Sequence, residues 1–506
     1  MASLAGADTP TPSTAKDLLQ DGRLRLTVTD AVHLALDSAA VRLDRLGYES
    51  AQQGIDRAAS RFDPRLSSVF SANDSTQRST LQTEGALRRV DTGQSASVGL
   101  DQRFPLGTQS SLSIGGGRSS TNNADVNVNP QFNSSFRFSV RQPLWRNRAG
   151  VQDRAEVRVA KYEVARSRAT LAAQLQGAIE AAVGRYWAAV LATEGLAVKR
   201  QSLSLAETTH AKNKRMLELG ALPPLEIHRS EADVATRKLD VLRGEFDLRR
   251  RQEELKRELG IDADPALARA ELDLVDTPEM AATTAVDVEA AVADALRARP
   301  EIAALERAAQ SEETQVAIAR DRNRLGLDLT ASYSLSGVSG TELDLSTSPA
   351  AVISQGGLSR AFDQVGRRQF PVYTIGLVVD LPLRNRANRA NLAGARIQQE
   401  RGRLALQEKR LDVALEVRRA VDEVSHAQRA IELATQARDL SQKTLESEQR
   451  KYELGAAELF LVLQEQARFA QSELSLLATR VEYQETLTRL DLVTGRLLDR
   501  YQVSVD

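Results

Sequence analysis

The chain has 506 residues, with 67 Lys and Arg against 68 Asp and Glu, and it has no cysteine. The balanced charge gives no support for nucleic-acid binding as a main role. The lack of cysteine excludes disulfides, cysteine-ligated zinc and thiol catalysis. Aromatic residues make up only 4%, which favours narrow helical seams of Ala and Leu over a thick globular core.

Residues 1–25 predict an N-terminal tail rich in Thr, Pro, Ser and Ala. This tail lacks the apolar region of a signal peptide, so we interpret it as the start of a mature chain from which a signal peptide was removed. No stretch approaches about 20 continuous apolar residues, and we therefore expect no transmembrane helix.

One pattern occurs twice in the chain, because Leu26–Ala59 has the same apolar spacing as Val286–Ala319. Each copy predicts a helix, and after each come strands, a very long helix and a return helix. The first helix is expected to begin at Asp30 as N-cap and to end before Asp63-Pro64. The expected organisation is a first repeat at 26–260, a connector at 261–285 that is irregular, a second repeat at 286–495 and a C-terminal tail at 496–506.

Alternation of apolar and polar residues with period two predicts strands in both repeats. The predicted strands are 66–72 and 134–144 in the first repeat, and 326–336 and 372–383 in the second. Two interpretations fit this alternation: a soluble antiparallel sheet with one buried face, or a membrane β-barrel with its apolar face toward lipid. Long polar loops are expected between the strands, at residues 71–94 and 338–371.

A further hairpin is predicted in the first repeat alone, at residues 95–104 and 110–116 around the turn Pro105-Leu106-Gly107. It either adds strands to the sheet or lies outside the membrane as a flap. The four principal strands of one chain cannot close a barrel, which needs about eight or more. If the strands form a barrel, several copies must share it, and cyclic symmetry is the ordinary way to do so.

The long helices are predicted at 150–219 and 388–454, each about 100 Å long at 1.5 Å per residue. The return helices are predicted at 225–259 and 459–494. In each case a return helix and a repeat-opening helix together have about the length of one long helix. Two short helices stacked end to end would therefore cover the apolar stripe of a long helix laid beside them.

The order of these elements resembles the TolC-type outer-membrane efflux protein family. The residues that carry the resemblance are Arg299-Pro300-Glu301, the strand exits Gln142-Pro143-Leu144 and Leu381-Pro382-Leu383, Arg185-Tyr186-Trp187, and Arg450–Gly455. The resemblance implies an α+β membrane protein that is internally duplicated and trimeric. Its long α-helical coiled-coil barrel would be continuous with a shared twelve-stranded transmembrane β-barrel. The expected location is the outer membrane, with a periplasmic helical tunnel.

The resemblance implies a passive exit duct of a tripartite efflux or secretion system. Its partners would be a periplasmic adaptor, an inner-membrane pump, the outer-membrane bilayer and two further copies of the chain, with no nucleic acid. No enzyme activity, cofactor, catalytic residue or metal site is expected. The alternative is a periplasmic coiled-coil adaptor or scaffold without a pore, which would also have long helical hairpins.

The resemblance also implies which residues contact the adaptor, at the turns that end the long helices. These tips are Leu219, Gly220 and Ala221 in the first repeat, and Leu454, Gly455 and Ala456 in the second. A glycine that merely ends a helix is the competing interpretation, because positive φ is common at that position.

The expected pore constriction consists of Glu226, Leu461, Gln464 and Tyr452. Three copies of Glu226 would form a carboxylate ring, which favours cations. Leu461 and Gln464 stand where family members often carry aspartates, which suggests a more hydrophobic constriction. Tyr452 matches a tyrosine of an inter-helix latch, or it is an ordinary coiled-coil aromatic. Phe460 is either an adaptor contact or a local core residue.

Overall fold

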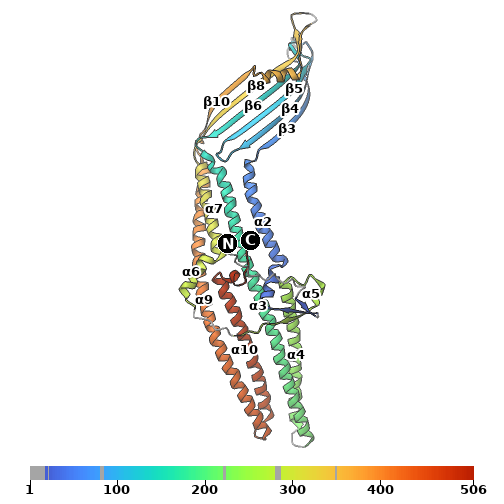
Figure 1. The fold of residues 1–506 in the computed structure, drawn as a ribbon, viewed down its shortest axis with the longest axis vertical. Coiled ribbons are helices and arrows are strands. Elements are labelled where there is room, and N and C mark those ends of the chain that lie inside the picture. Colours follow the sequence, from blue (N-terminus) through green and yellow to red (C-terminus); the bar gives the residue numbers. More distant parts are fainter. Residues whose placement is uncertain are drawn as a thin grey trace, which may run out of the picture. The chain divides into compact units, whose positions relative to one another are not determined.

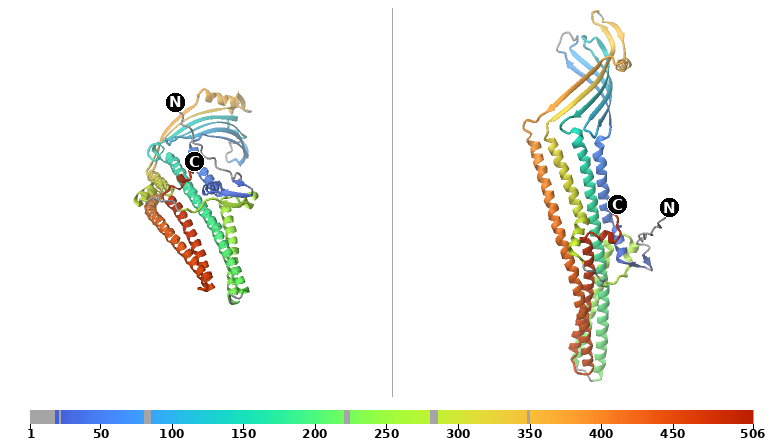
Figure 2. Two further views of the ribbon diagram at one scale, coloured as in Figure 1. Left: turned by 60° about the horizontal axis from the view of Figure 1, so that its bottom comes forward. Right: turned by 60° about the vertical axis from the view of Figure 1, so that its left-hand side comes forward.

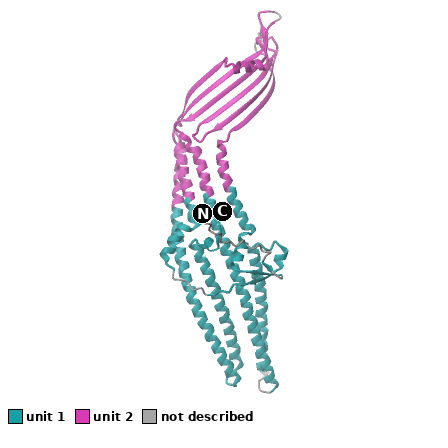
Figure 3. Cartoon of the chain, viewed as in Figure 1, with its two compact units in different colours: residues 1–50, 165–306, 404–506 teal, residues 51–164, 307–403 magenta. Residues whose placement is uncertain are grey.

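The computed structural model describes residues 18–20, 22–79, 85–219, 224–279, 286–347 and 350–505. These residues form two compact units (Figure 3). The helical unit comprises residues 1–50, 165–306 and 404–506, and the sheet unit comprises residues 51–164 and 307–403.

Each repeat opens with two consecutive helices. They are α1 (Val28–Leu36) and α2 (Ala39–Ala59) in the first repeat, and α6 (Val288–Ala298) and α7 (Pro300–Arg322) in the second. Thr27 is the N-cap of α1: its hydroxyl accepts from the backbone N–H of Asp30, whose carboxylate accepts from the backbone N–H of Thr27. The expectation that Asp30 is the N-cap is therefore wrong by three residues. Asp287 caps α6 at the equivalent place.

A long helix and a shorter return helix follow in each repeat. They are α3 (Val151–Glu218) with α4 (Pro224–Glu258), and α9 (Arg386–Glu453) with α10 (Leu459–Val493). None of the described helices combines the length and the apolar content that crossing a membrane requires.

The sheet unit holds one antiparallel sheet with the order β3-β4-β5-β6-β8-β10 (Figure 1). Its strands are β3 (Arg65–Arg78), β4 (Arg88–Arg103), β5 (Gln109–Thr121), β6 (Val128–Pro143), β8 (Gly326–Asp344) and β10 (Pro371–Asp380). The short β9 (Ala351–Gln355) pairs with the end of β8 beyond the reach of β10.

The predicted hairpin adds strands to the sheet, which is the first of the two alternatives for it. It joins as β4 and β5, between β3 and β6, so this order contains six strands in addition to the short β9, where four principal strands were expected. The predicted loops are also too long, since β3 extends to Arg78 and β8 to Asp344. These extensions, residues 73–78 and 337–344, contain only two apolar side chains, Val338 and Leu343, so they carry no apolar alternation. Pairing with neighbouring strands holds them in the sheet, and pairing is not visible in a local window of sequence.

Helix α8 (Leu358–Gly366) lies against the sheet over two glycines. A Cβ at Gly116 would lie 2.9 Å from the ring of Phe362, and a Cβ at Gly337 would overlap the carbonyl oxygen of Ala361. The side chain of Gln364 donates to the carbonyl of Val338 and accepts from its N–H, both at 2.9 Å. The two glycines therefore allow the helix to approach the strand backbone closely.

Four helix segments leave the same end of the sheet (Figure 2). They are the sheet-unit parts of α2, α3, α7 and α9. The buried carboxylate of Asp321 on α7 accepts from the backbone N–H of Asn147 at 2.7 Å and from the side chain of Gln152 at 2.8 Å. Arg146 pairs with Asp380 at 2.7 Å. These contacts join the two repeats where strands become helices.

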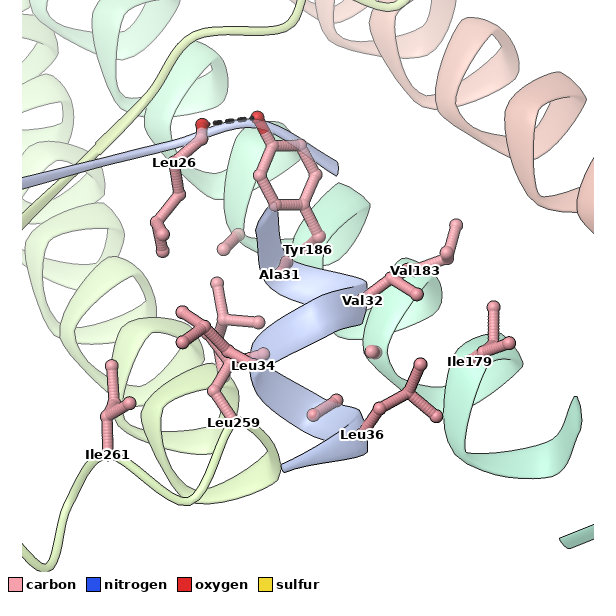
Figure 4. Close-up of a cluster of buried hydrophobic side chains, with 14 of the residues drawn as sticks. Leu26, Ala31, Val32, Leu34, Leu36, Ile179, Val183, Tyr186, Leu259 and Ile261 are labelled. Carbon is pink, nitrogen blue, oxygen red and sulfur yellow. Dashed lines mark hydrogen bonds between the residues drawn. The ribbon is translucent and has the colours of Figure 1, made fainter. Parts of the chain in front are cut away.

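The helical unit has a hydrophobic core between α1, α3 and α4 (Figure 4). Leu26, Val32 and Tyr186 are fully buried there, and the Tyr186 hydroxyl donates to the carbonyl of Leu26 at 3.1 Å. The same hydroxyl lies 3.0 Å from the carboxylate of Asp276. Burial raises the pKa of Tyr186, so this phenol stays protonated and donates.

Three stretches predicted to be irregular contain regular structure. Strands β1 (Leu19–Gln20) and β2 (Arg23–Leu26) lie in the predicted N-terminal tail, α5 (Pro265–Arg269) and β7 (Glu271–Leu274) in the connector, and α11 (Leu497–Arg500) in the C-terminal tail. Strand β2 pairs in parallel with β7, and Leu497 is fully buried. The expectation of irregular structure is wrong here because each piece gains its partner only from a distant part of the chain.

Candidate functional site

The candidate site lies where the long helices turn back, in the helical unit. Helix α3 ends at Glu218, followed by Leu219, whose side chain is 82% exposed. Gly220 and Ala221, predicted at the first tip, lie outside the described residues. At the first tip, the structure therefore describes the chain up to Leu219 and again from Pro224, where α4 begins.

The second tip is described completely. Gly455 has φ +74°, its N–H donates to the carbonyl of Tyr452 at 3.0 Å, and the N–H of Ala456 donates to the carbonyl of Lys451 at 2.8 Å. These two bonds form the Schellman motif, which satisfies carbonyls at a helix end and requires positive φ. A helix-ending role alone thus accounts for Gly455. Leu454, which is 84% exposed, has no such structural explanation.

Exposed apolar side chains gather in the sequence around both tips. They are Leu219 and Leu225 in the first repeat, and Leu454, Phe460 and Leu461 in the second. We call these five residues the tip set. Phe460 is 54% exposed, so it is not a core residue within one chain.

Tyr452 connects the two repeats near these tips. Its hydroxyl donates to the side-chain oxygen of Asn213 on α3 at 2.8 Å. Asn213 is fully buried, and its side-chain nitrogen is buried with no hydrogen-bond partner among the described residues. Lys212, one residue earlier, pairs with Glu453 at 3.4 Å, but both of these side chains are exposed. The Tyr452–Asn213 bond is therefore the stronger link, because exposed ion pairs contribute little.

Glu226 lies close enough to act on Tyr452. Burial raises the pKa of Tyr452, and the negative charge of Glu226 raises it further, which keeps the phenol protonated as a donor. The Glu226 carboxylate accepts from Arg229 at 2.8 Å, while its second oxygen is buried without a hydrogen-bond partner among the described residues. In the single chain this carboxylate is thus covered and ion-paired, and the ring of three carboxylates stays a prediction.

Leu461 and Gln464 are both exposed on α10. Because they are three residues apart, they lie on one face of the helix. The structure thus brings Tyr452 and Glu226 together, while Leu461 and Gln464 share an exposed face. Asn213 was missed in the sequence. Its signal was an uncharged amide between Lys212 and Lys214, since a lone buried Asn in a coiled coil commonly fixes register.

No metal site is evident in the described part of the chain, where no three His, Asp or Glu side chains are grouped to hold an ion. His228 lies 3.7 Å from Glu231, both exposed, and His210 contacts Ser230 at 2.8 Å.

Three comparisons with known proteins bear on the family. The family model described as outer membrane efflux protein matches residues 291–496. The matched residues make up about two fifths of the chain, and nearly all of them lie in the second repeat. No curated protein sequence matches the chain.

Solved structures with a similar fold include outer membrane proteins from three bacteria. The CmeC outer membrane channel of Campylobacter jejuni is 15% identical, with 96% of this chain and 88% of that chain covered and a TM-score of 0.68. The outer membrane protein VceC of Vibrio cholerae is 14% identical, with 92% and 96% covered and a TM-score of 0.66. The MtrE channel of Neisseria gonorrhoeae, solved in an open state, is 16% identical, with 93% and 89% covered and a TM-score of 0.61. At these identities the likeness concerns the fold.

Proposed function

We propose that this protein belongs to the outer membrane efflux protein family and is a trimeric exit duct of the outer membrane, which passes substrates, chemically unchanged, from a periplasmic adaptor and an inner-membrane pump to the outside. The observation that carries the proposal is a sheet whose paired residues are apolar on one face and polar on the other, joined along the chain to two copies of a long helical hairpin. Such a sheet suits a wall between lipid and a water-filled lumen. A periplasmic adaptor or scaffold without a pore would leave an apolar sheet face in water, because no lipid would cover it.

The tip set is the proposed contact surface for the adaptor. Leu219 and Leu454 are more than four-fifths exposed, and both stand at the ends of long helices. Exposed apolar residues at a helix end gain free energy when a partner covers them. Replacing Leu219 and Leu454 together with Ser should weaken binding of the adaptor without lowering the melting temperature of the duct.

The Tyr452–Asn213 bond is the proposed latch of the closed state. It holds the end of α9 against α3, and Asn213 is fully buried, so breaking the bond leaves the buried side-chain oxygen of Asn213 unpaired. Tyr452→Phe should raise the open probability of purified channels in planar bilayers. Lys212→Gln is the matched control, because it removes an exposed link between the same helices and should change little. Equal effects of the two variants would contradict the latch.

Leu461 tests the constriction. Leu461→Asp in three copies would add a carboxylate ring, so micromolar to millimolar divalent cations should reduce the conductance of this variant. Unchanged cation sensitivity would show that Leu461 does not line the narrowest part.

Extraction tests the duct itself. The protein should require detergent for release from membranes and should run as an oligomer that dissociates on heating. Recovery as a soluble monomer would contradict the proposal and favour the adaptor or scaffold alternative.

A further inference from the structure

The geometry of the sheet unit points to a barrel of eighteen strands, six from each of three copies, while only four helix segments leave the described sheet in each copy. This inference rests on the trimer of the proposed function, and it replaces the expected twelve-stranded barrel. The additional strands are β4 and β5, which have no counterpart in the second repeat.

The inserted strands are long enough to span a membrane. β4 has 16 residues and β5 has 13, against the roughly 9–11 that a tilted spanning strand needs. Both pair along nearly their whole length, β4 with β3 and β5 with β6. A flap outside the membrane would leave β3 to pair with β6, whereas the observed register separates these two strands completely.

The faces of the inserted strands match those of their neighbours. One row of directly paired residues crosses all six strands on the apolar face: Leu66, Leu100, Leu112, Phe138, Tyr333 and Tyr373. A row on the opposite face is polar throughout: Arg65, Asp101, Ser111, Ser139, Ser332 and Thr374. Because paired residues share a face, β4 and β5 present apolar groups to lipid and polar groups to the lumen exactly where β3 and β6 do.

The turn of the inserted hairpin is fixed to the start of α3. Arg103 donates to the buried carboxylate of Asp153 at 3.4 Å, and Asn147 donates to the other oxygen of that carboxylate at 2.7 Å. Gln102 donates to the carbonyl of Phe62 at 3.1 Å. Gly107 and Gly150 approach so closely that a Cβ on Gly150 would overlap the carbonyl oxygen of Pro105. The hairpin is thus seated between the helices as part of the wall.

The two edges of the sheet fit further copies of the same chain. Among the described residues β3 pairs only with β4, and β10 only with β8, so each has one open edge. An open edge in lipid costs several kcal/mol for every unpaired backbone group. The first and last of six antiparallel strands run in opposite directions, so β10 of one copy can pair antiparallel with β3 of the next. The apolar row reaches both edges, which continues the lipid-facing surface across the seam.

Insertion of a hairpin preserves this closure because it adds two strands and leaves the direction of the last strand unchanged. It widens the barrel without adding helices. At about 4.8 Å between strands and about 40° of tilt, eighteen strands give a diameter near 36 Å, against about 24 Å for twelve. The barrel lumen would then have about twice the cross-section of a twelve-stranded one, so the helical tunnel rather than the barrel would limit passage.

Excision of residues 88–127 tests the inference, because it removes β4 and β5 and joins Leu87 to Val128 with the up-and-down order intact. Electron cryomicroscopy of the detergent-purified wild-type oligomer should show eighteen strands, and the excised variant should be narrower by about one third. Replacing residues 351–366, which hold β9 and α8, with a short Gly-Ser linker is the control and should leave the diameter unchanged. A wild-type barrel of twelve strands would overturn the inference.

The absence of native cysteine allows a second test that needs no variant lacking the hairpin. The hydroxyl oxygens of Ser71 and Ser95 are 2.7 Å apart, and those of Ser111 and Ser139 are 2.6 Å apart, so each pair replaced with Cys should cross-link within one chain. Cross-linking of neither pair in membranes would also overturn the inference. Efflux in cells is a separate measurement: an eighteen-stranded oligomer without efflux would contradict the proposed function alone, and an efflux-competent duct with twelve strands would contradict the barrel alone.

Discussion

The first and second repeats share their helices but differ in their strands. Both begin at a side-chain cap, Thr27 in one and Asp287 in the other, and both continue into a 68-residue helix. Between those elements the first repeat has four strands, while the second has two spanning strands with β9 and α8 between them. The lengths of paired helices are coupled by packing, whereas an up-and-down sheet accepts another hairpin without disturbing its ends. Divergence therefore accumulated where the fold tolerates it.

The repeats also differ in what holds their openings together. The first uses a buried phenol, Tyr186, bonded to Leu26 and Asp276. The second uses a buried guanidinium, Arg299, which pairs with Glu301 at 2.8 Å and with Glu416. A neutral anchor on the long helix α3 and an ionic anchor between α6 and α7 should respond differently to mutation and to pH.

The largest loss of stability is expected where the turn of the inserted hairpin contacts the start of α3. Gly150→Ala places a Cβ on a residue with φ +66° and against the carbonyl oxygen of Pro105. Backbone strain and overpacking should together lower the free energy of unfolding by about 3 kcal/mol. The oligomer should melt at a clearly lower temperature or fail to assemble. The matched control is Gly394→Ala in the second repeat, where nothing lies near the new Cβ. A glycine inside a helix is itself unfavourable, so this control should be neutral or slightly stabilising.

The next effect concerns the neutral anchor. Tyr186→Phe keeps the packing but removes the hydroxyl that donates to Leu26 and Asp276. The free energy of unfolding is therefore expected to fall by about 1–3 kcal/mol. Chemical or thermal unfolding should show the same loss at neutral and mildly acidic pH, because the phenol stays protonated throughout. A loss that varies strongly over this range would contradict the assignment of Tyr186 as a neutral donor.

The ionic anchor should be sensitive to acid. Burial disfavours the charged form of Glu301, but the hydrogen bonds from Arg299 and from its own backbone N–H, with the positive charges of Arg299 and Lys409, together outweigh burial and lower the pKa of Glu301. A lowered native pKa stabilises the fold above the carboxyl's usual value of about 4.3, and the stabilisation is lost as the pH falls through the native value. Glu301→Gln should therefore lower the free energy of unfolding by about 1 kcal/mol at neutral pH. The melting temperature of this variant should also fall less steeply with decreasing pH than that of the wild type. The same dependence of melting temperature on acidic pH in variant and wild type would contradict the role of the Arg299–Glu301 ion pair.

The smallest effect is expected at the second tip. In Gly455→Ala the new Cβ has no neighbour within 4 Å, so only the positive φ is unfavourable. The free energy of unfolding should therefore fall by about 1 kcal/mol. Gly495→Ala, at a helix end with similar φ, would also press on Ala298 at 2.9 Å and should cost more. Melting of the two variants side by side should give that order, and the reverse order would show that the tip is packed in the assembly.

Much of this protein was determined by its sequence alone. The duplication, the long helices and the two-faced strands are local patterns, since periods of 3.6 and 2 and the placement of glycine and proline act over a few residues. Gly455 as a helix end follows from the same local chemistry.

The pairing of strands and of buried polar groups depends on contacts between distant parts of the chain. Nothing local places β4 beside β3 and β5 beside β6, or pairs β2 in parallel with β7 across more than two hundred residues. The contact of Tyr452 with Asn213 likewise joins helices far apart in sequence. These features depend on which backbone edges and buried polar groups find partners. That requirement is met by the folded chain as a whole, and no short window of residues contains it.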